Sequence, residues 1–178
     1  MKDTRKQLKI AGIINTILII AAIVLSFVYK TSDTWGIIIK VAGIVALLAG
    51  GVYAVTGYQK DSSDFYKIFM VIYAIHLALF IISGIKNSID SGDSFVPVII
   101  NFIVLVVALV LAFAKDLGKK ESFRMAILIF AFQLVNFIFI IIVNPKYIIP
   151  FFVELVLTCL TSLFVAAKYT DKDIRGTK

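Results

Sequence analysis

Six long apolar runs, separated by short polar segments, set the pattern of this sequence. A membrane-spanning helix needs about 20 mostly apolar residues, because each residue adds about 1.5 Å across a hydrocarbon core about 30 Å thick. The runs predict spanning helices at residues 10–29, 35–57, 68–85, 95–114, 125–143 and 147–167. Apolar residues are continuous within each run, without the alternation typical of a β-barrel. We expect an all-α polytopic membrane protein with a single integral membrane domain over residues 1–178.

The six predicted helices form three tandem hairpins. Short turns join the two helices of each hairpin, and polar loops of ten residues at 58–67 and 115–124 join successive hairpins. A weak repeat with a period of 58 residues agrees with this arrangement, since Lys2-Asp3-Thr4 recurs as Lys60-Asp61-Ser62. We trust the repetition of the hairpin more than a common descent of its sequence.

Composition excludes other classes of protein. Hydrophobic residues make up 61% of the chain, and its mean hydropathy is +1.01, whereas soluble domains are about 45–50% apolar. Only 29 residues are charged, 18 basic and 11 acidic, which is too few to cover a soluble domain of this size. Soluble enzymes and disordered chains are therefore excluded. The single cysteine, Cys159, leaves no disulfide framework.

Basic residues gather on one side of the predicted membrane. The two tails and the two ten-residue loops carry 14 Lys and Arg residues, and the three short turns carry 3. The positive-inside rule places both termini in the cytoplasm, and the first run is expected to be a retained signal anchor. The Ile- and Lys-rich composition suggests a bacterial cell membrane. The basic side points to lipid headgroups as partners, and not to nucleic acid.

Glycines recur every seven residues in the second predicted helix, at Gly36, Gly43, Gly50 and Gly57. Seven residues turn about 700°, so these glycines share one face. Small residues let helix backbones approach closely in lipid. We expect a helix-packing seam here and a central position for this helix, with a sliding or dimer seam as the alternative.

Polar residues inside the predicted spans are the main functional candidates, because charges in a bilayer are costly. Lys40 and Glu154 are the only charges there, about 8 and 10 Å from the outer ends of their helices. Glu154 shares a helix face with Thr158, and His76 lies near the midplane. We expect a polar site in the outer half of the bilayer, formed by Lys40, His76, Asn101, Asn136, Glu154 and Thr158.

Three interpretations of these residues remain open. In the first, Lys40 and Glu154 pair and the amides only hold helices together. In the second, an outward-opening pocket binds a small solute or ion, with Lys40 receiving an anionic group and Glu154 balancing it. In the third, the residues contact another membrane protein. His76 fits either a packing role or, at its depth, a proton relay.

Motifs for catalysis, metal binding and cofactor binding are missing from the sequence. It has no Gly-x-Ser-x-Gly, no His-Glu-x-x-His and no Gly-x-x-x-x-Gly-Lys-Ser motif. The single histidine excludes metal motifs that need two. We expect a protein that is not an enzyme and that needs no cofactor and no metal.

The three hairpins and the Gly36-x6-Gly43-x6-Gly50 pattern resemble the HdeD-type small membrane proteins, which are linked to acid-stress resistance. Less closely, six helices with both ends inside resemble the substrate-binding subunit of energy-coupling-factor vitamin transporters. We expect a component or accessory subunit of small-solute or ion transport. The alternative is a stress-protective or immunity protein that acts by binding a partner in the bilayer. That partner would be another membrane subunit or a second copy of the chain.

Overall fold

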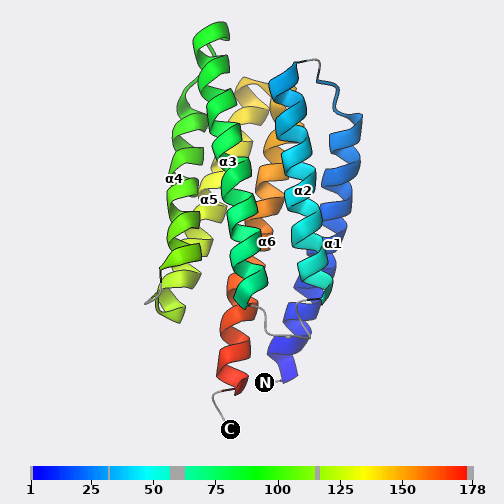
Figure 1. Cartoon of the computed structure of the whole chain (residues 1–178), viewed down its shortest axis with the longest axis vertical. Coiled ribbons are helices and arrows are strands. Elements are labelled where there is room, and N and C mark those ends of the chain that lie inside the picture. Colours follow the sequence, from blue (N-terminus) through cyan, green and yellow to red (C-terminus); the bar gives the residue numbers. More distant parts are fainter. Residues whose placement is uncertain (1, 32, 57–62, 115–116, 176–178) are drawn as a thin grey trace.

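Six long helices make up most of the described part of the chain (Figure 1). The computed structural model of the 178-residue chain describes residues 2–31, 33–56, 63–114 and 117–175. Its helices are α1 (Lys2–Val28), α2 (Thr34–Thr56), α3 (Ser63–Ser91), α4 (Val96–Phe113), α5 (Lys119–Val143) and α6 (Ile148–Arg175), with a short 3-10 helix, η1 (Pro145–Tyr147), before α6. All six long helices contain a stretch long and apolar enough to cross a membrane. The predicted all-α, multi-pass membrane fold is confirmed.

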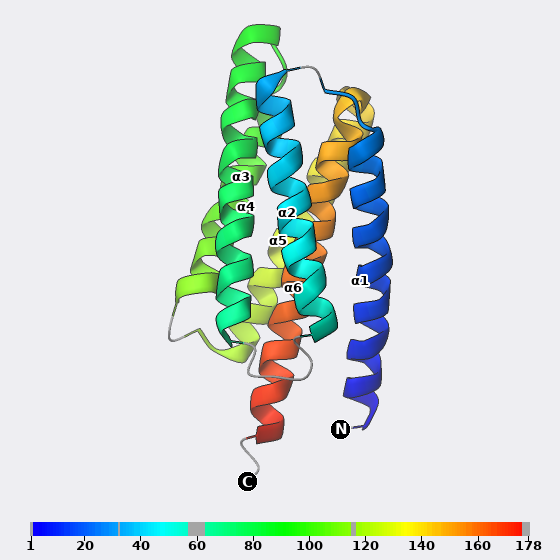
Figure 2. The ribbon, with the colours of Figure 1, turned by 45° about the vertical axis from the view of Figure 1, so that its right-hand side comes forward.

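The helices run along the long axis of one bundle, and both chain ends lie at the same end of it (Figures 1 and 2). We call this the terminal end. The opposite end, called the turn end, carries the connections α1–α2, α3–α4 and α5–α6. The two helices of each of these pairs are in contact, so the three predicted hairpins are present.

The central helix of the bundle is α6, not α2. Residues of α6 contact α1, α2, α3 and α5, and 61% of its spanning segment is buried, against 28% of that of α2. The expectation of a central second helix was therefore wrong. A glycine strip allows close approach on one face only, whereas α6 buries side chains around most of its circumference, among them Val153, Glu154, Val156, Leu157, Thr158 and Leu160.

Two of the four glycines in the second helix do form the predicted packing seam. A Cβ added at Gly50 would lie 2.8 Å from a methyl of Leu160, and one added at Gly43 would lie 3.1 Å from the ring of His76. Gly36 instead lies in the first turn of α2, beside Thr31 and Asp33 of the connection that precedes the helix. Gly57 is outside the described residues. The seam therefore joins α2 to α3 and α6.

Four helices extend past the predicted spans. The first begins at Lys2 and the sixth ends at Arg175, each eight residues beyond its predicted bound. The third was expected to end at residue 85 but continues to Ser91, because the first helix-breaking residue is Gly92, with a φ of +69°. The fifth begins at Lys119, six residues before its predicted apolar start. Hydropathy marks what lipid can cover, whereas capping and breaking residues decide where a helix ends.

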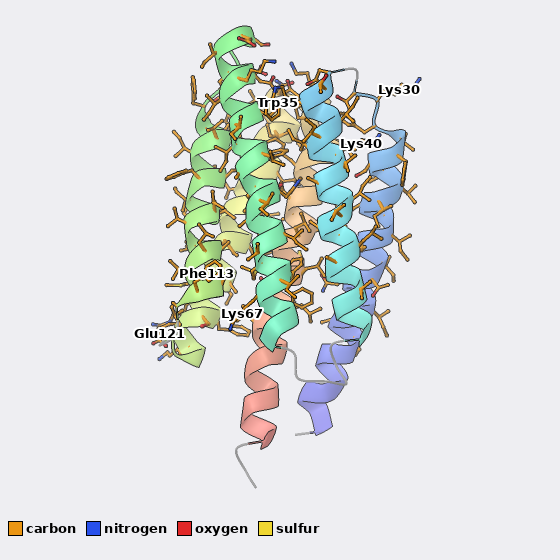
Figure 3. All side chains as sticks on the ribbon, viewed as in Figure 1. Lys30, Trp35, Lys40, Lys67, Phe113 and Glu121 are labelled. Atoms are coloured by element: carbon orange, nitrogen blue, oxygen red, sulfur yellow. The ribbon has the colours of Figure 1, made fainter. Side chains whose placement is uncertain are left out.

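The outer surface of the bundle is apolar, as contact with lipid requires. Large exposed side chains include Ile13, Ile17, Ile99, Phe102, Ile127 and Val135. Figure 3 shows side chains of this surface projecting away from the ribbons, with Lys30 and Trp35 near the turn end and Lys67 and Glu121 toward the terminal end. This apolar band with polar ends fits a bilayer.

Candidate functional site: a cavity at the turn end

A cavity of about 460 Å³ enters the bundle from the turn end. Its lining includes Asp33, Gly92 and Ser94, which are exposed residues of the turns, so the cavity opens at this end. It reaches inward to His76 on α3 and Asn101 on α4. All six long helices contribute to the lining. The volume falls within the range of about 300–1,000 Å³ that is typical of small-molecule sites.

Lys40 lies in the cavity wall, half-buried, on the first part of α2. Its ammonium nitrogen donates a hydrogen bond of 3.0 Å to the backbone carbonyl of Tyr29, at the end of α1. The long lysine stem covers the distance between its depth in the helix and this carbonyl. Because a carbonyl carries no formal charge, this contact does not neutralise the positive charge of Lys40.

Glu154 pairs with His76, and not with Lys40. The Nε2 atom of His76 lies 2.6 Å from Oε1 of Glu154. Both side chains are buried, with 2% of His76 and none of Glu154 exposed. His76 lines the cavity and Glu154 lies behind it, outside the lining. The interpretation in which Lys40 and Glu154 neutralise each other is therefore wrong, because each has a different partner.

The pair belongs to a ladder of contacts between α3 and α6. Toward the turn end, the rings of Phe80 and Phe151 meet edge to face with centroids 5.0 Å apart. Toward the terminal end, the hydroxyls of Tyr73 and Thr158 lie 2.9 Å apart. Thr158 also donates to the carbonyl of Glu154 at 2.8 Å. These contacts place Thr158 below the pair as its structural support, away from the cavity lining.

Three buried amides connect α4 to α5 beside the inner end of the cavity. The Oδ1 atom of Asn101 accepts hydrogen bonds from Gln133 at 2.7 Å and from Asn136 at 3.3 Å. Asn136 also donates to the carbonyl of Pro97 at 3.4 Å. Asn101 lines the cavity, whereas Asn136 and Gln133 lie behind it. The side-chain oxygens of Asn136 and Gln133 have no hydrogen-bond partner.

Acidic residues at the cavity mouth are held by neighbouring donors. Asp33 accepts hydrogen bonds from the backbone N–H of Gly36 at 2.9 Å and from the hydroxyl of Thr31 at 2.8 Å. The Gly36 bond is the main cause of the lowered pKa of Asp33. On the other side of the mouth, Asp93 accepts from Asn144 at 3.0 Å, which ties the α3–α4 turn to the end of α5.

Of the six predicted site residues, the structure places three in the cavity wall, Lys40, His76 and Asn101. The other three are outside the lining: Asn136 contacts Asn101, Glu154 contacts His76, and Thr158 supports Glu154. The sequence interpretation missed the His76–Glu154 contact and the two acidic residues at the mouth. A signal for the contact was present, since Tyr73, His76 and Phe80 share one helix face and Thr158, Glu154 and Phe151 share another. Antiparallel packing of these two faces brings them together in that order.

Metal binding has no support in the part of the chain that the structure describes, where no three His, Cys, Asp or Glu side chains gather around one point. Comparisons with family models, curated protein sequences and solved structures find no match for this chain. The resemblance to HdeD-type proteins stays a prediction.

Proposed function

We propose that this membrane protein binds a small solute with an anionic group in its cavity, as a component or accessory subunit of a transport system. The observation that supports this most is the Lys40 ammonium group, which lies in the wall of a cavity of about 460 Å³ with a backbone carbonyl as its hydrogen-bond acceptor. A charge kept inside a membrane protein without a carboxylate partner is costly unless a ligand offsets it.

The mixture of polar and apolar residues in the cavity wall favours a ligand with one charged and one apolar part. Lys40, His76 and Asn101 supply polar groups, and Ile39, Phe80, Val98, Ile140 and Phe151 supply apolar surface. The acidic residues Asp33 and Asp93 lie at the mouth and accept hydrogen bonds from protein donors. The deeper part of the wall is therefore where an anionic group meets positive charge.

The same proposal sets the orientation of the chain. The terminal end carries most of the basic residues, 14 against 3 in the turns, so it faces the cytoplasm of the cell membrane by the positive-inside rule. The cavity then opens to the outside. We propose no catalytic step: the protein binds its solute and hands it to a further membrane subunit or to a second copy of the chain.

The experiment is a ligand screen by thermal stability. Purified protein in mild detergent is heated with each member of a panel of small carboxylic acids, amino acids, phosphate and matched neutral amides. A ligand at about 100 times its Kd stabilises the folded state by about 2.7 kcal/mol. We expect at least one anionic compound, and not its neutral amide, to raise the Tm of the wild type.

Two lysine variants serve as test and control. Lys40→Met keeps the apolar stem and removes the charge, so it should abolish the stabilisation. Lys86→Met removes a charge from an exposed residue near the turn end that is outside the cavity lining, and should leave the stabilisation unchanged. The proposal is contradicted if no anionic compound stabilises the wild type, or if Lys40→Met responds as the wild type does.

A further inference from the structure

His76 separates the cavity from a fully buried carboxylate. Its ring lines the cavity on one side, and its Nε2 atom lies 2.6 Å from Oε1 of Glu154 on the other. A nitrogen and an oxygen approach this closely when a proton lies between them. The pair therefore holds at least one proton inside the spanning part of the bundle.

The remaining polar atoms of the pair have capacity for another proton. Nδ1 of His76 and Oε2 of Glu154 are buried and have no hydrogen-bond partner. Neutral imidazole accepts a proton on its unprotonated nitrogen, and a carboxylate accepts one on either oxygen. A buried acceptor without a donor is costly, so a pair with no role beyond packing would be expected to have these atoms satisfied.

Few other titratable groups surround the pair in the described part of the chain. Besides Glu154, α6 brings Cys159, and α3 itself brings Tyr73, whose hydroxyl already contacts Thr158. From α2, Lys40 lines the same cavity. The neighbouring polar groups of α4 and α5 are the amides of Asn101, Gln133 and Asn136, which do not titrate. A change in the charge of the pair is therefore felt mainly by Lys40 and by whatever occupies the cavity.

We propose that His76 and Glu154 form a proton-binding site that is loaded from the cavity. A hydronium ion in cavity water gives its proton to Nδ1 of His76 and becomes water. The proton on Nε2 then moves across the 2.6 Å contact to Oε1 of Glu154. The ring is left neutral and the carboxylate becomes a carboxylic acid, so the pair gains one proton and one unit of positive charge.

This step rests on the proposed function and adds a coupling to it. When the pair takes up a proton, the cavity becomes more positive and holds an anionic solute more tightly. Binding that takes up one proton strengthens by about tenfold for each unit by which the pH falls. The coupling is reciprocal, because an anion in the cavity favours proton uptake by the same factor. The solute and the proton would then be bound and released together.

The test uses the fact that His76 is the only histidine in the chain. The full-length protein is labelled with isotopic histidine, reconstituted in bilayers and titrated between about pH 5 and 8, where histidines usually titrate. Magnetic resonance follows the ring, and infrared spectroscopy follows the C=O band of protonated carboxylic acid. We expect the ring signals and one carboxylic acid band to change together in the wild type.

Two carboxylate variants make the assignment. Glu154→Gln has nearly the same shape and should remove the pH-dependent band and alter the titration of the ring. Asp90→Asn removes an exposed carboxylate near the end of α3 that is outside the cavity lining, and should leave both signals unchanged. The proposal is overturned if the ring and the band are constant over the whole range, or if Glu154→Gln titrates as the wild type does. No solute is present, so this result and that of the ligand screen fail or succeed separately.

Discussion

Several polar side chains within the spans have their partners on neighbouring parts of the bundle. The Lys40 ammonium group reaches a carbonyl at the end of α1, and His76 meets Glu154. The Asn101 oxygen accepts from two amides of α5. Each such contact removes a cost that the same group would have in hydrocarbon. A single substitution should therefore lower stability mainly because it leaves the partner side chain buried without its hydrogen bond.

Asn101→Val should destabilise the bundle by about 1 kcal/mol, because it leaves the buried amide donors of Gln133 and Asn136 without their shared acceptor. Unfolding by a denaturing detergent measures the change. The triple variant Asn101→Val, Gln133→Leu, Asn136→Leu should recover stability, since no donor is left unpaired. A triple variant as unstable as the sum of its single variants would contradict this account.

Asp33→Ala should lower the free energy of unfolding by about 1 kcal/mol, because it removes the cap at the N-terminus of α2. Asp33→Asn should lower it by less. The pKa of Asp33 is lowered by the Gly36 N–H bond. Its stabilising effect is therefore present above the unfolded pKa and is lost as the pH falls through the lower, folded pKa. Melting curves at several pH values measure this, and a wild-type advantage over Asp33→Ala that grows on acidification would contradict it.

At the scale of elements, contacts of α6 with four other helices organise the bundle. The close approach of α2 depends on Gly50, where an added Cβ would lie 2.8 Å from Leu160 and 3.0 Å from Phe69. Gly51 is different, because its added Cβ would meet Ile19 on α1 at 3.7 Å, an ordinary contact. Substitution of Gly50 therefore tests the close packing, and the same substitution at the adjacent Gly51 is its control.

Gly50→Ala should destabilise the protein by about 1–3 kcal/mol, because Leu160 and Phe69 must move to make room. Gly51→Ala should leave stability unchanged or raise it by up to about 1 kcal/mol, because alanine favours a helix over glycine. Thermal unfolding in one detergent compares the two. Equal melting temperatures for the two variants would mean that α2 does not pack on α6 and α3 as described.

The sequence predicts where the spans lie and how deep a residue sits, but not which helices are neighbours. The long apolar runs predicted the six spans. The helical rise of about 1.5 Å per residue predicted the depth of Lys40 and Glu154 in the membrane. Depth does not say which helices are neighbours, so equal depth alone suggested a pair that does not form. The partner of Glu154 depends on α6 being central and on its direction against α3. The limits of α3 were also missed, since Gly92 ends the helix beyond the apolar run.

For the whole molecule, the proposed solute and proton sites both need a water-filled cavity that opens at the turn end. Ser83 lines that cavity and is half-buried, whereas the adjacent Ile82 is 49% exposed on the bundle but lies outside the lining. In a membrane, the surface around Ile82 is covered by lipid. Water and charged reagents should therefore reach the less exposed of the two residues.

The most direct test replaces Cys159 by serine and compares Ser83→Cys with Ile82→Cys in intact cells, using a membrane-impermeant thiol reagent added from outside. A thiol reacts as its thiolate, which needs water. We predict that Ser83→Cys is labelled and that Ile82→Cys is not. Labelling of Ile82→Cys but not Ser83→Cys, or of neither, would contradict a cavity that opens to the outside and would remove the basis of the proposed solute and proton sites.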